Sequence, residues 1–503
     1  MKRRSNEGIQ DSEERRKGRF GSLATISIAA ALLISVAASS FARTSSREST
    51  VEFGRFGTVH LYAPPHPASR LVVFVSGDGG WNKGVVDMAR ELSTMGVIVA
   101  GVDIRSYLRN LESVPGTCSY PAADYEGLSQ FLQKRLGFDR YEPPVLAGYS
   151  SGATLVYALL AEAPPNTFKG AMSLGFCPDL PLKKPFCRGN GLEWRPGPKG
   201  KGVIFEPAKD LRQPWIAFDG EIDQVCDAKA ARAYVANVPG GEMVLLPKVG
   251  HGFSVPRNWL GPFKAAYGRI AAAPMERDFS RPSASTVKRE TGAAAVVAAP
   301  ADLPLIDVPP SRPGAAWVAV ILSGDGGWAG IDRSIGNFLA ANGVPVVGLN
   351  SLQYFWHRKT PETAAHDLQR LIEYAMVRWN VPEVVLIGYS RGADVLPAMA
   401  SRLPEQLRSR VRMVALLGPS RTTTFEFHLS DWLSDSERGS AVAPEVEKLR
   451  GTKILCVYGA DEKESLCRDL APEIATPMEM GGGHHFDGGY EEIARAIMRD
   501  SER

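Results

Sequence analysis

The sequence predicts an α/β protein with two tandem domains, each a mostly parallel sheet with helices on both faces. Three motifs support this prediction, because each occurs twice and in the same order. The hexapeptide SGDGGW stands at 76–81 and 323–328, a GYSxGA segment stands at 148–153 and 388–393, and a glycine-histidine segment follows later in each copy. Ordered sets of motifs seldom recur by chance, so we interpret the chain as a duplication.

The length of 503 residues agrees, since one hydrophobic core rarely supports a chain of that size. We expect a signal peptide at 1–42, a first α/β domain at 50–272 and a second one at 313–503. The segment 273–312 between them is rich in Ala and Pro, which is typical of a linker.

The N-terminus has the pattern of an export signal. Basic residues precede an apolar, uncharged stretch at 23–38, and a small-residue cleavage pattern ends at Ala42. An uncleaved anchor and a buried helix are the alternatives. Export, or an anchor, would place both domains outside the cytoplasm.

The six cysteines are even in number within each copy, as expected for disulfides in an oxidising compartment. Cys456 and Cys467 are predicted to close a short loop around the acidic residues of the second copy. Three pairings are possible among the others, which are Cys118, Cys177, Cys187 and Cys226.

Apolar runs alternate with helical patterns in each copy, which is typical of a parallel sheet covered on both faces. The copies begin with buried strands at 71–75 and 317–322. In the second copy we expect a strand at 344–349, a helix at 361–379 and a strand at 384–388.

Ser150 and Ser390 stand in the two GYSxGA segments, each between an apolar strand and a helical pattern. At such a turn a serine is held on a strained backbone with its hydroxyl exposed, and the flanking glycines permit the close approach. The context predicts a nucleophile in an α/β-hydrolase-like domain. The alternative is a glycine-rich turn whose serine caps the helix.

A nucleophilic serine needs a base and a carboxylate that orients the base, in the chain order Ser, Asp, His for this architecture. In the first copy Asp223 and His251 follow Ser150 in that order. They form a possible second triad beside the one in the second copy.

In the second copy a strand predicted at 453–458 leads to two adjacent acidic residues. We choose Asp461 as the carboxylate, with Glu462 as a close competitor. His484 is preferred to His485 as the base, because it aligns with the histidine of the first copy.

The oxyanion that forms on attack needs preorganised backbone amides. We expect Asp325 and Arg391 to supply them in the second copy, and Asp78 and Ser151 in the first. A phosphate-binding loop is the alternative, but no Lys-Ser/Thr pair follows the glycines.

Other classes of function receive no support. A net charge of +3 argues against a protein that binds nucleic acid by neutralising phosphates. Metal-ligand spacings are not found in the sequence, and a serine mechanism needs neither a metal nor another cofactor.

Three segments of the second copy resemble the AcvB/VirJ family of bacterial virulence proteins: the hexapeptide at 323–328, GYSRGADVLP at 388–397 and GGHHF at 482–486. The decapeptide is the most specific. The resemblance covers nearly the whole mature chain, whose two-domain length with an export signal is similar to AcvB members rather than to the shorter VirJ members. It implies a periplasmic serine hydrolase that removes lysine from lysyl-phosphatidylglycerol at the outer leaflet of the inner membrane. The resemblance also implies a connection with type IV secretion, whose components are possible partners.

An aminoacyl ester carries a cationic amine, for which Asp394 and Asp325 are candidate acidic partners. Each has an equally good structural role, in a loop or at a helix terminus. The aromatic and basic segment 354–359 either meets a lipid surface or forms a half-buried loop.

Two other functions share these motifs: a general exported esterase or lipase, and a secretion-associated binding or chaperone-like protein.

Overall fold

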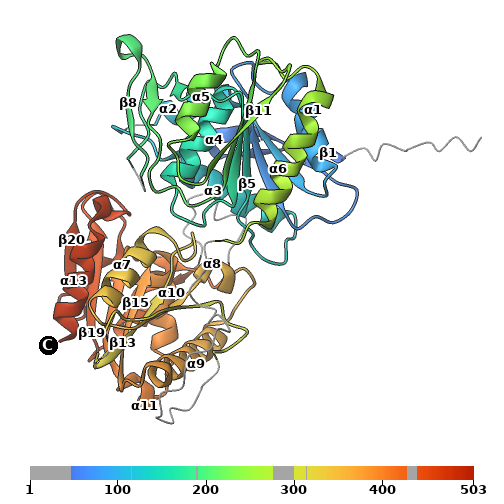
Figure 1. The fold of residues 1–503 in the computed structure, drawn as a ribbon. Coiled ribbons are helices and arrows are strands. Elements are labelled where there is room, and N and C mark those ends of the chain that lie inside the picture. The colour runs from blue at the N-terminus through green and yellow to red at the C-terminus, as the bar shows by residue number, and fades with distance from the viewer. Residues whose placement is uncertain are drawn as a thin grey trace, which may run out of the picture. The chain divides into compact units, whose positions relative to one another are not determined.

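The computed structural model describes residues 47–114, 116–188, 191–275, 299–312, 314–426 and 439–502. The predicted export signal and the central part of the predicted linker lie outside these ranges. Within them, no helix is both long enough and apolar enough to cross a bilayer. Thr44–Arg503 groups as one compact unit, in which two large sheets are built from separate parts of the chain (Figure 1). The tandem α/β fold predicted from the sequence is confirmed.

We call the part of the chain whose described residues lie between 47 and 275 the first half, and the part between 299 and 502 the second half. The sheet of the first half has the strand order β1-β2-β4-β3-β5-β6-β10-β11. Its first two pairings, β1 with β2 and β2 with β4, are antiparallel, and the rest are parallel. The strands are β1 Arg47–Phe53, β2 Gly57–Ala63, β3 Leu71–Val75, β4 Ile98–Val102, β5 Val145–Tyr149, β6 Gly170–Leu174, β10 Trp215–Gly220 and β11 Gly241–Leu246. The helices are α1 Lys83–Ser93, α2 Ile104–Glu112, α3 Pro121–Arg135, α4 Ser151–Glu162, α5 Ala228–Val235 and α6 Leu260–Ala272.

The sheet of the second half has the order β12-β14-β13-β15-β16-β19-β20, and only the pairing of β12 with β14 is antiparallel. The strands are β12 Leu305–Val308, β13 Trp317–Leu322, β14 Val346–Leu349, β15 Glu383–Tyr389, β16 Val411–Leu417, β19 Lys453–Gly459 and β20 Thr476–Met480. The helices are α7 Gly330–Ala341, α8 Ser351–Tyr354, α9 Pro361–Trp379, α10 Arg391–Ala400, α11 Glu405–Arg408, α12 Ala443–Glu447 and α13 Tyr490–Ser501.

The two strand orders match from β2 onward, so the duplication visible in the motifs is a duplication of the whole sheet. Two small sheets complete the described fold. The first joins β7 Asp179–Leu180, β9 Val203–Phe205 and β8 Trp194–Pro196, and the second pairs β17 Thr422–Thr423 with β18 Ser440–Ala441.

Predicted elements coincide closely with observed ones. The strands expected at 71–75 and 317–322 are β3 and β13, and the helix expected at 361–379 is α9. The strand expected from residue 344 begins only at Val346, since Pro345 before it has no amide to contribute to the sheet.

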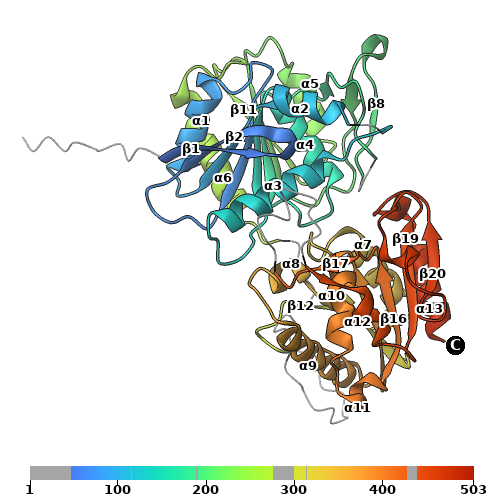
Figure 2. The same cartoon turned by 180° about the vertical axis from the view of Figure 1, so that it is seen from behind.

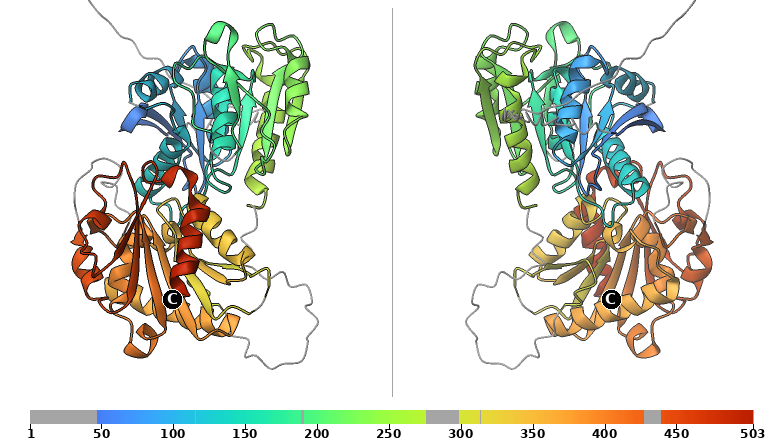
Figure 3. Two further views of the ribbon diagram at one scale, coloured as in Figure 1. Left: turned by 90° about the vertical axis from the view of Figure 1, so that its left-hand side faces the viewer. Right: turned by 90° about the vertical axis from the view of Figure 1, so that its right-hand side faces the viewer.

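Both faces of the central strands of each sheet are buried. In β3, Val73 and Val75 belong to the hydrophobic cluster on one face, and Val72 and Phe74 to the cluster on the other. All four are fully buried, and β13 shows the same alternation. Helices α2, α3 and α4 cover one face of the first sheet and α1 and α6 the other, whereas α9 and α10 face α7 and α13 across the second (Figures 2 and 3).

All six cysteines form disulfides, and the predicted pair Cys456–Cys467 is confirmed. Of the three pairings possible in the first half, the structure shows the one with Cys118–Cys187 and Cys177–Cys226. Three disulfides fit a protein of an oxidising compartment.

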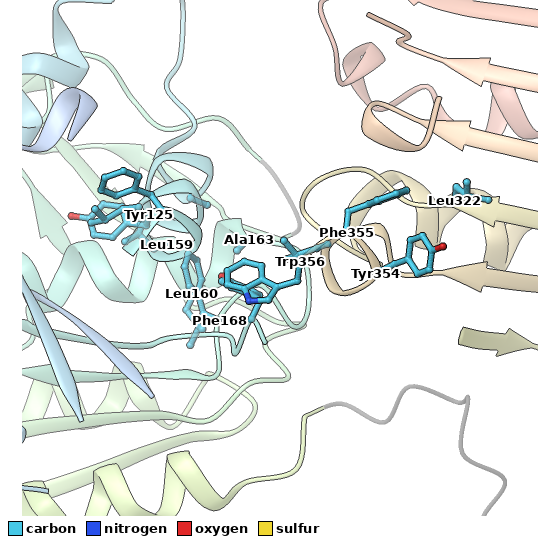
Figure 4. Close-up of a cluster of buried hydrophobic side chains, with 14 of the residues drawn as sticks. Tyr125, Leu159, Leu160, Ala163, Phe168, Leu322, Tyr354, Phe355 and Trp356 are labelled. Atoms are coloured by element: carbon cyan, nitrogen blue, oxygen red, sulfur yellow. The ribbon is translucent and has the colours of Figure 1, made fainter. Parts of the chain in front are cut away.

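The aromatic part of segment 354–359 is packed inside the protein. Tyr354, Phe355 and Trp356 are at most 4% exposed. The Trp356 indole donates a hydrogen bond of 2.7 Å to the carbonyl of Phe138 in the first half. Figure 4 shows it in one buried cluster with Phe168. Trp356 thus joins the two halves, and since all three rings are buried the lipid-contact interpretation is wrong for them.

Candidate active site

Both motif serines lie at the predicted strand-to-helix turn. Ser150 follows β5 with φ 55°, and Ser390 follows β15 with φ 51°. Neither side chain caps the helix that follows, which removes the capping interpretation. A Cβ added to Gly148 would lie 2.1 Å from the carbonyl oxygen of Gly152, so this turn excludes larger residues. The backbone therefore holds each serine in a strained conformation with its hydroxyl free of the helix.

In the first half the predicted triad is brought together. His251 Nε2 lies 2.9 Å from Ser150 Oγ, and His251 Nδ1 lies 2.9 Å from Asp223 Oδ2. The other carboxylate oxygen of Asp223 accepts hydrogen bonds from the amides of Val225 and Cys226, at 2.8 and 3.0 Å. The Asp223 side chain is fully buried, so its carboxyl group is shielded from water and held against His251. We call Ser150, His251 and Asp223 the first site.

The hexapeptide loop of the first half reaches this serine. A Cβ added to Gly77 would lie 2.9 Å from the Cβ of Ser150, so only glycine permits the approach. Asp78 follows in the same loop and is exposed, and Ser151 is the first residue of α4. Their amides make none of the backbone hydrogen bonds seen among the described residues. Both amides are therefore open to a substrate oxyanion, and their role there stays a prediction.

In the second half the carboxylate that contacts the histidine is Glu462, and the choice of Asp461 is not supported. Glu462 Oε1 lies 2.5 Å from His484 Nδ1, and its other oxygen accepts the amide of Gly459 at 2.7 Å. Asp461 is exposed, and its amide bonds the carbonyl of Gly482. We call Ser390, His484 and Glu462 the second site.

The geometry of one turn explains this correction. In the first half the amide of Asp223 bonds the carbonyl of Gly220, the last residue of β10, at 3.1 Å. In the second half the amide of Glu462 bonds the carbonyl of Gly459, the last residue of β19, at 3.0 Å. The third residue after the glycine points back to the histidine in both halves. Counting from that glycine identifies Glu462.

His484, rather than His485, takes the place of the first-half histidine. Tyr389 Oη donates to the carbonyl of His484, just as Tyr149 Oη donates to that of His251. A second common feature is a glycine of positive φ against the ring. A Cβ at Gly418 would lie 2.8 Å from His484 Cε1. Neither the tyrosines nor these glycines were identified from the sequence, although each tyrosine directly precedes its serine.

The second site differs from the first in the charges around its histidine and in the hydrogen bonding of its serine. Burial opposes a positive charge on His484, but the hydrogen bond and charge of Glu462, with the charges of Asp325 and Asp394, outweigh it and raise the pKa of His484. Among the described residues no hydrogen bond joins His484 to Ser390. Catalytic hydrogen bonds are often loose in the absence of substrate and tighten when it binds.

The remaining predicted residues surround the second site. Asp394 accepts a 2.6 Å hydrogen bond from the amide of Ser420, and burial raises its pKa to about 7. Arg391 follows the serine, and its side chain donates to the carbonyl and hydroxyl of Thr424. Asp325 is exposed in the hexapeptide loop. In the part of the chain that the structure describes, no cluster of His, Cys, Asp and Glu side chains has the form of a metal site.

Comparisons with known proteins show which family and which solved structures the chain is similar to. The model of a family described as bacterial virulence protein (VirJ) matches residues 69–174 and 316–503. Among curated proteins, none matches the sequence. Similar solved structures include the esterase domain of a Rhodothermus marinus protein, at 18% identity and TM-score 0.31, covering 45% of this chain and 98% of that one. Est1E from Butyrivibrio proteoclasticus is 16% identical, with TM-score 0.32 and coverage of 45% and 100%. A lidless α/β serine hydrolase from Xanthomonas campestris is 18% identical, with TM-score 0.29 and coverage of 46% and 98%.

Proposed function

This chain belongs to the VirJ family of bacterial virulence proteins, and we propose that it is a serine hydrolase of carboxylic esters. One observation carries the proposal: the unbroken hydrogen-bonded chain from Ser150 through His251 to Asp223, with the serine on a strained turn. A serine and a base within hydrogen-bonding reach, the base oriented by a third group, form the signature of nucleophilic catalysis.

The reaction at the first site follows from this geometry. Ser150 Oγ attacks the ester carbonyl carbon while its proton passes to His251 Nε2. The resulting oxyanion is stabilised by the amides of Asp78 and Ser151. Collapse of this intermediate breaks the ester bond, and His251 returns the proton to the departing alcohol. Water then hydrolyses the acyl-enzyme by the same steps and releases the acid.

The second site is proposed to run the same reaction with Ser390, His484 and Glu462, and with the amides of Asp325 and Arg391. Here the surroundings are acidic. Asp325 and Asp394 act electrostatically on His484, which suits a substrate with a positive charge on its acyl group.

The substrate that we propose for the second site is the aminoacyl ester of lysyl-phosphatidylglycerol, cleaved to lysine and phosphatidylglycerol in the periplasm. The motif resemblance and the acidic surroundings support this choice, and the three disulfides fit the compartment. Asp394 is proposed to contact the substrate amine, although it already accepts the amide of Ser420.

The test uses the full chain with Ser150→Ala, Ser390→Ala and both changes together. Vesicles that contain lysyl-phosphatidylglycerol and a soluble uncharged ester serve as substrates. We expect Ser390→Ala to abolish release of lysine, Ser150→Ala to reduce cleavage of the uncharged ester, and the double variant to be inactive.

Two results would favour a different function. If the unaltered protein cleaves the uncharged ester but never releases lysine, it is a general esterase. If it cleaves neither substrate, a binding or chaperone-like role in secretion becomes the better explanation.

A further inference from the structure

Helix α3 of the first half carries a polar stripe that faces the second half. Glu126, Gln130 and Lys134 are spaced four residues apart and so share one side of the helix. Gln130 Nε2 donates to the carbonyl of Asp325 at 3.4 Å. Lys134 donates to the carbonyl of Trp356 and pairs with the carboxylate of Glu426 at 3.4 Å. The stripe therefore contacts several loops of the second half, the predicted oxyanion loop among them.

Glu126 lies at the end of the stripe that meets this oxyanion loop. A Cβ added to Gly326 would lie 3.5 Å from Glu126 Oε1. Two residues earlier in the same loop, a Cβ on Gly324 would lie 3.5 Å from the Cβ of Ser390. One loop therefore contacts both the carboxylate of the first half and the serine of the second.

A second contact places the start of α3 beside the same site. The ring of Tyr120, which precedes the helix, has its centroid 6.2 Å from that of His485. His485 is adjacent to the base of the second site. The first half thus supplies part of the wall around that site.

The carboxyl group on this wall has no cationic partner among the described residues. Burial, and the nearby charge of Asp325, raise the pKa of Glu126 to about 8. Within the described ranges no Lys, Arg or His side chain forms an ion pair with Glu126. A buried carboxylate that faces another carboxylate is favourable only if it is protonated or if a cation approaches it.

We propose that Glu126 recognises the ammonium group of a cationic acyl ester bound at Ser390, so that the second active site is completed by a residue of the first half. This inference rests on the proposed function, since it requires the second site to hydrolyse esters. Glu126 is then a specificity residue, with Asp325 next to it and Asp394 beside the histidine. An ammonium group bound there would favour the ionised form of Glu126 beside Asp325, which no neutral acyl group can do.

The experiment uses the full chain with Ser150→Ala, so that only the second site turns over. Two esters with the same leaving group are compared, one of Nα-acetyl-lysine and one of Nα-acetyl-norleucine, which lacks the side-chain ammonium. Glu126→Gln preserves shape and removes the charge. We expect it to lower kcat/KM for the lysine ester about tenfold or more, and to leave the norleucine ester within about twofold.

Glu426→Gln is the matched control, because it neutralises another carboxylate that contacts the α3 stripe but does not contact the oxyanion loop. We expect it to change neither ester. An equal loss for both esters with Glu126→Gln would overturn the inference, because Glu126 would then only hold the loop. Unchanged kinetics would overturn it as well. If the Ser150→Ala protein hydrolyses neither ester, the proposed function of the second site fails and the inference falls with it.

Discussion

Gly175→Ala is predicted to disable the first site through a steric collision. Gly175 follows β6 and adopts φ 66°, and a Cβ there would lie 3.0 Å from His251 Cε1 and 3.2 Å from His251 Nδ1. Atoms in favourable contact stay about 3.5–4.0 Å apart, so the imidazole must move by about 0.5 Å. The two 2.9 Å hydrogen bonds of that ring then lengthen.

The size of the effect follows from this displacement. A misplacement of about 1 Å can cost about 100-fold in rate, so a shift of half that size predicts a fall in kcat of about 10-fold or more. The left-handed backbone adds strain for alanine of about 1–2 kcal/mol, which lowers the free energy of unfolding by that amount.

The assay is hydrolysis of an uncharged ester by the Ser390→Ala protein, together with thermal unfolding. Gly137→Ala is the control, because Gly137 has φ 73° and a Cβ there would meet nothing within 4 Å. Both variants should lose similar stability, and only Gly175→Ala should lose turnover. Full turnover by Gly175→Ala, or an equal loss in the control, would refute the reasoning.

Three further predictions concern the carboxylate, the base and a disulfide. Glu462→Gln should lower kcat of the second site about 100-fold or more, and Asp461→Asn should leave that kcat near the value of the unaltered protein. If ester hydrolysis ranks the two variants in the reverse order, Asp461 is the carboxylate that orients the histidine. Because the pKa of His484 is raised and only the neutral ring accepts the serine proton, kcat/KM of the second site should fall with acidification around a midpoint above about 6.5. A pH profile with a lower midpoint contradicts this. Replacing Cys177 and Cys226 by serine opens a loop with a sequence separation of 49, which should lower the free energy of unfolding by about 4 kcal/mol in urea titrations. It should also slow the first site, because the Cys226 amide holds the triad carboxylate; a variant with unchanged turnover would argue against that role.

The strands that carry the two sites were predictable from the sequence because they are buried on both faces. Such strands are continuous apolar runs, and β3 and β13 were located to the residue. The serines were predictable for a related reason, since the tight turn excludes side chains and so requires the glycines that mark it.

What the sequence did not reveal depends on side-chain direction and on contacts between distant parts of the chain. The choice between Asp461 and Glu462 is decided by a turn that directs one side chain inward and leaves the other in solvent. Trp356 looks like a surface aromatic until the partner carbonyl of Phe138, from the other half, is known. The contact between α3 and the loop at Asp325 could not be predicted for the same reason, because the two segments are far apart in the sequence.

The positive φ of both serines has a consequence for the history of the chain. Glycine would adopt that backbone without strain, and replacing either serine by glycine would relieve about 1–2 kcal/mol. In a half without the reaction, this substitution would relieve strain at no cost in activity, although the entropy that glycine loses on folding offsets part of the gain. Ser150 and Ser390 both remain, each at a cost in stability. The presence of both serines therefore agrees with the proposal that each half carries a catalytic site.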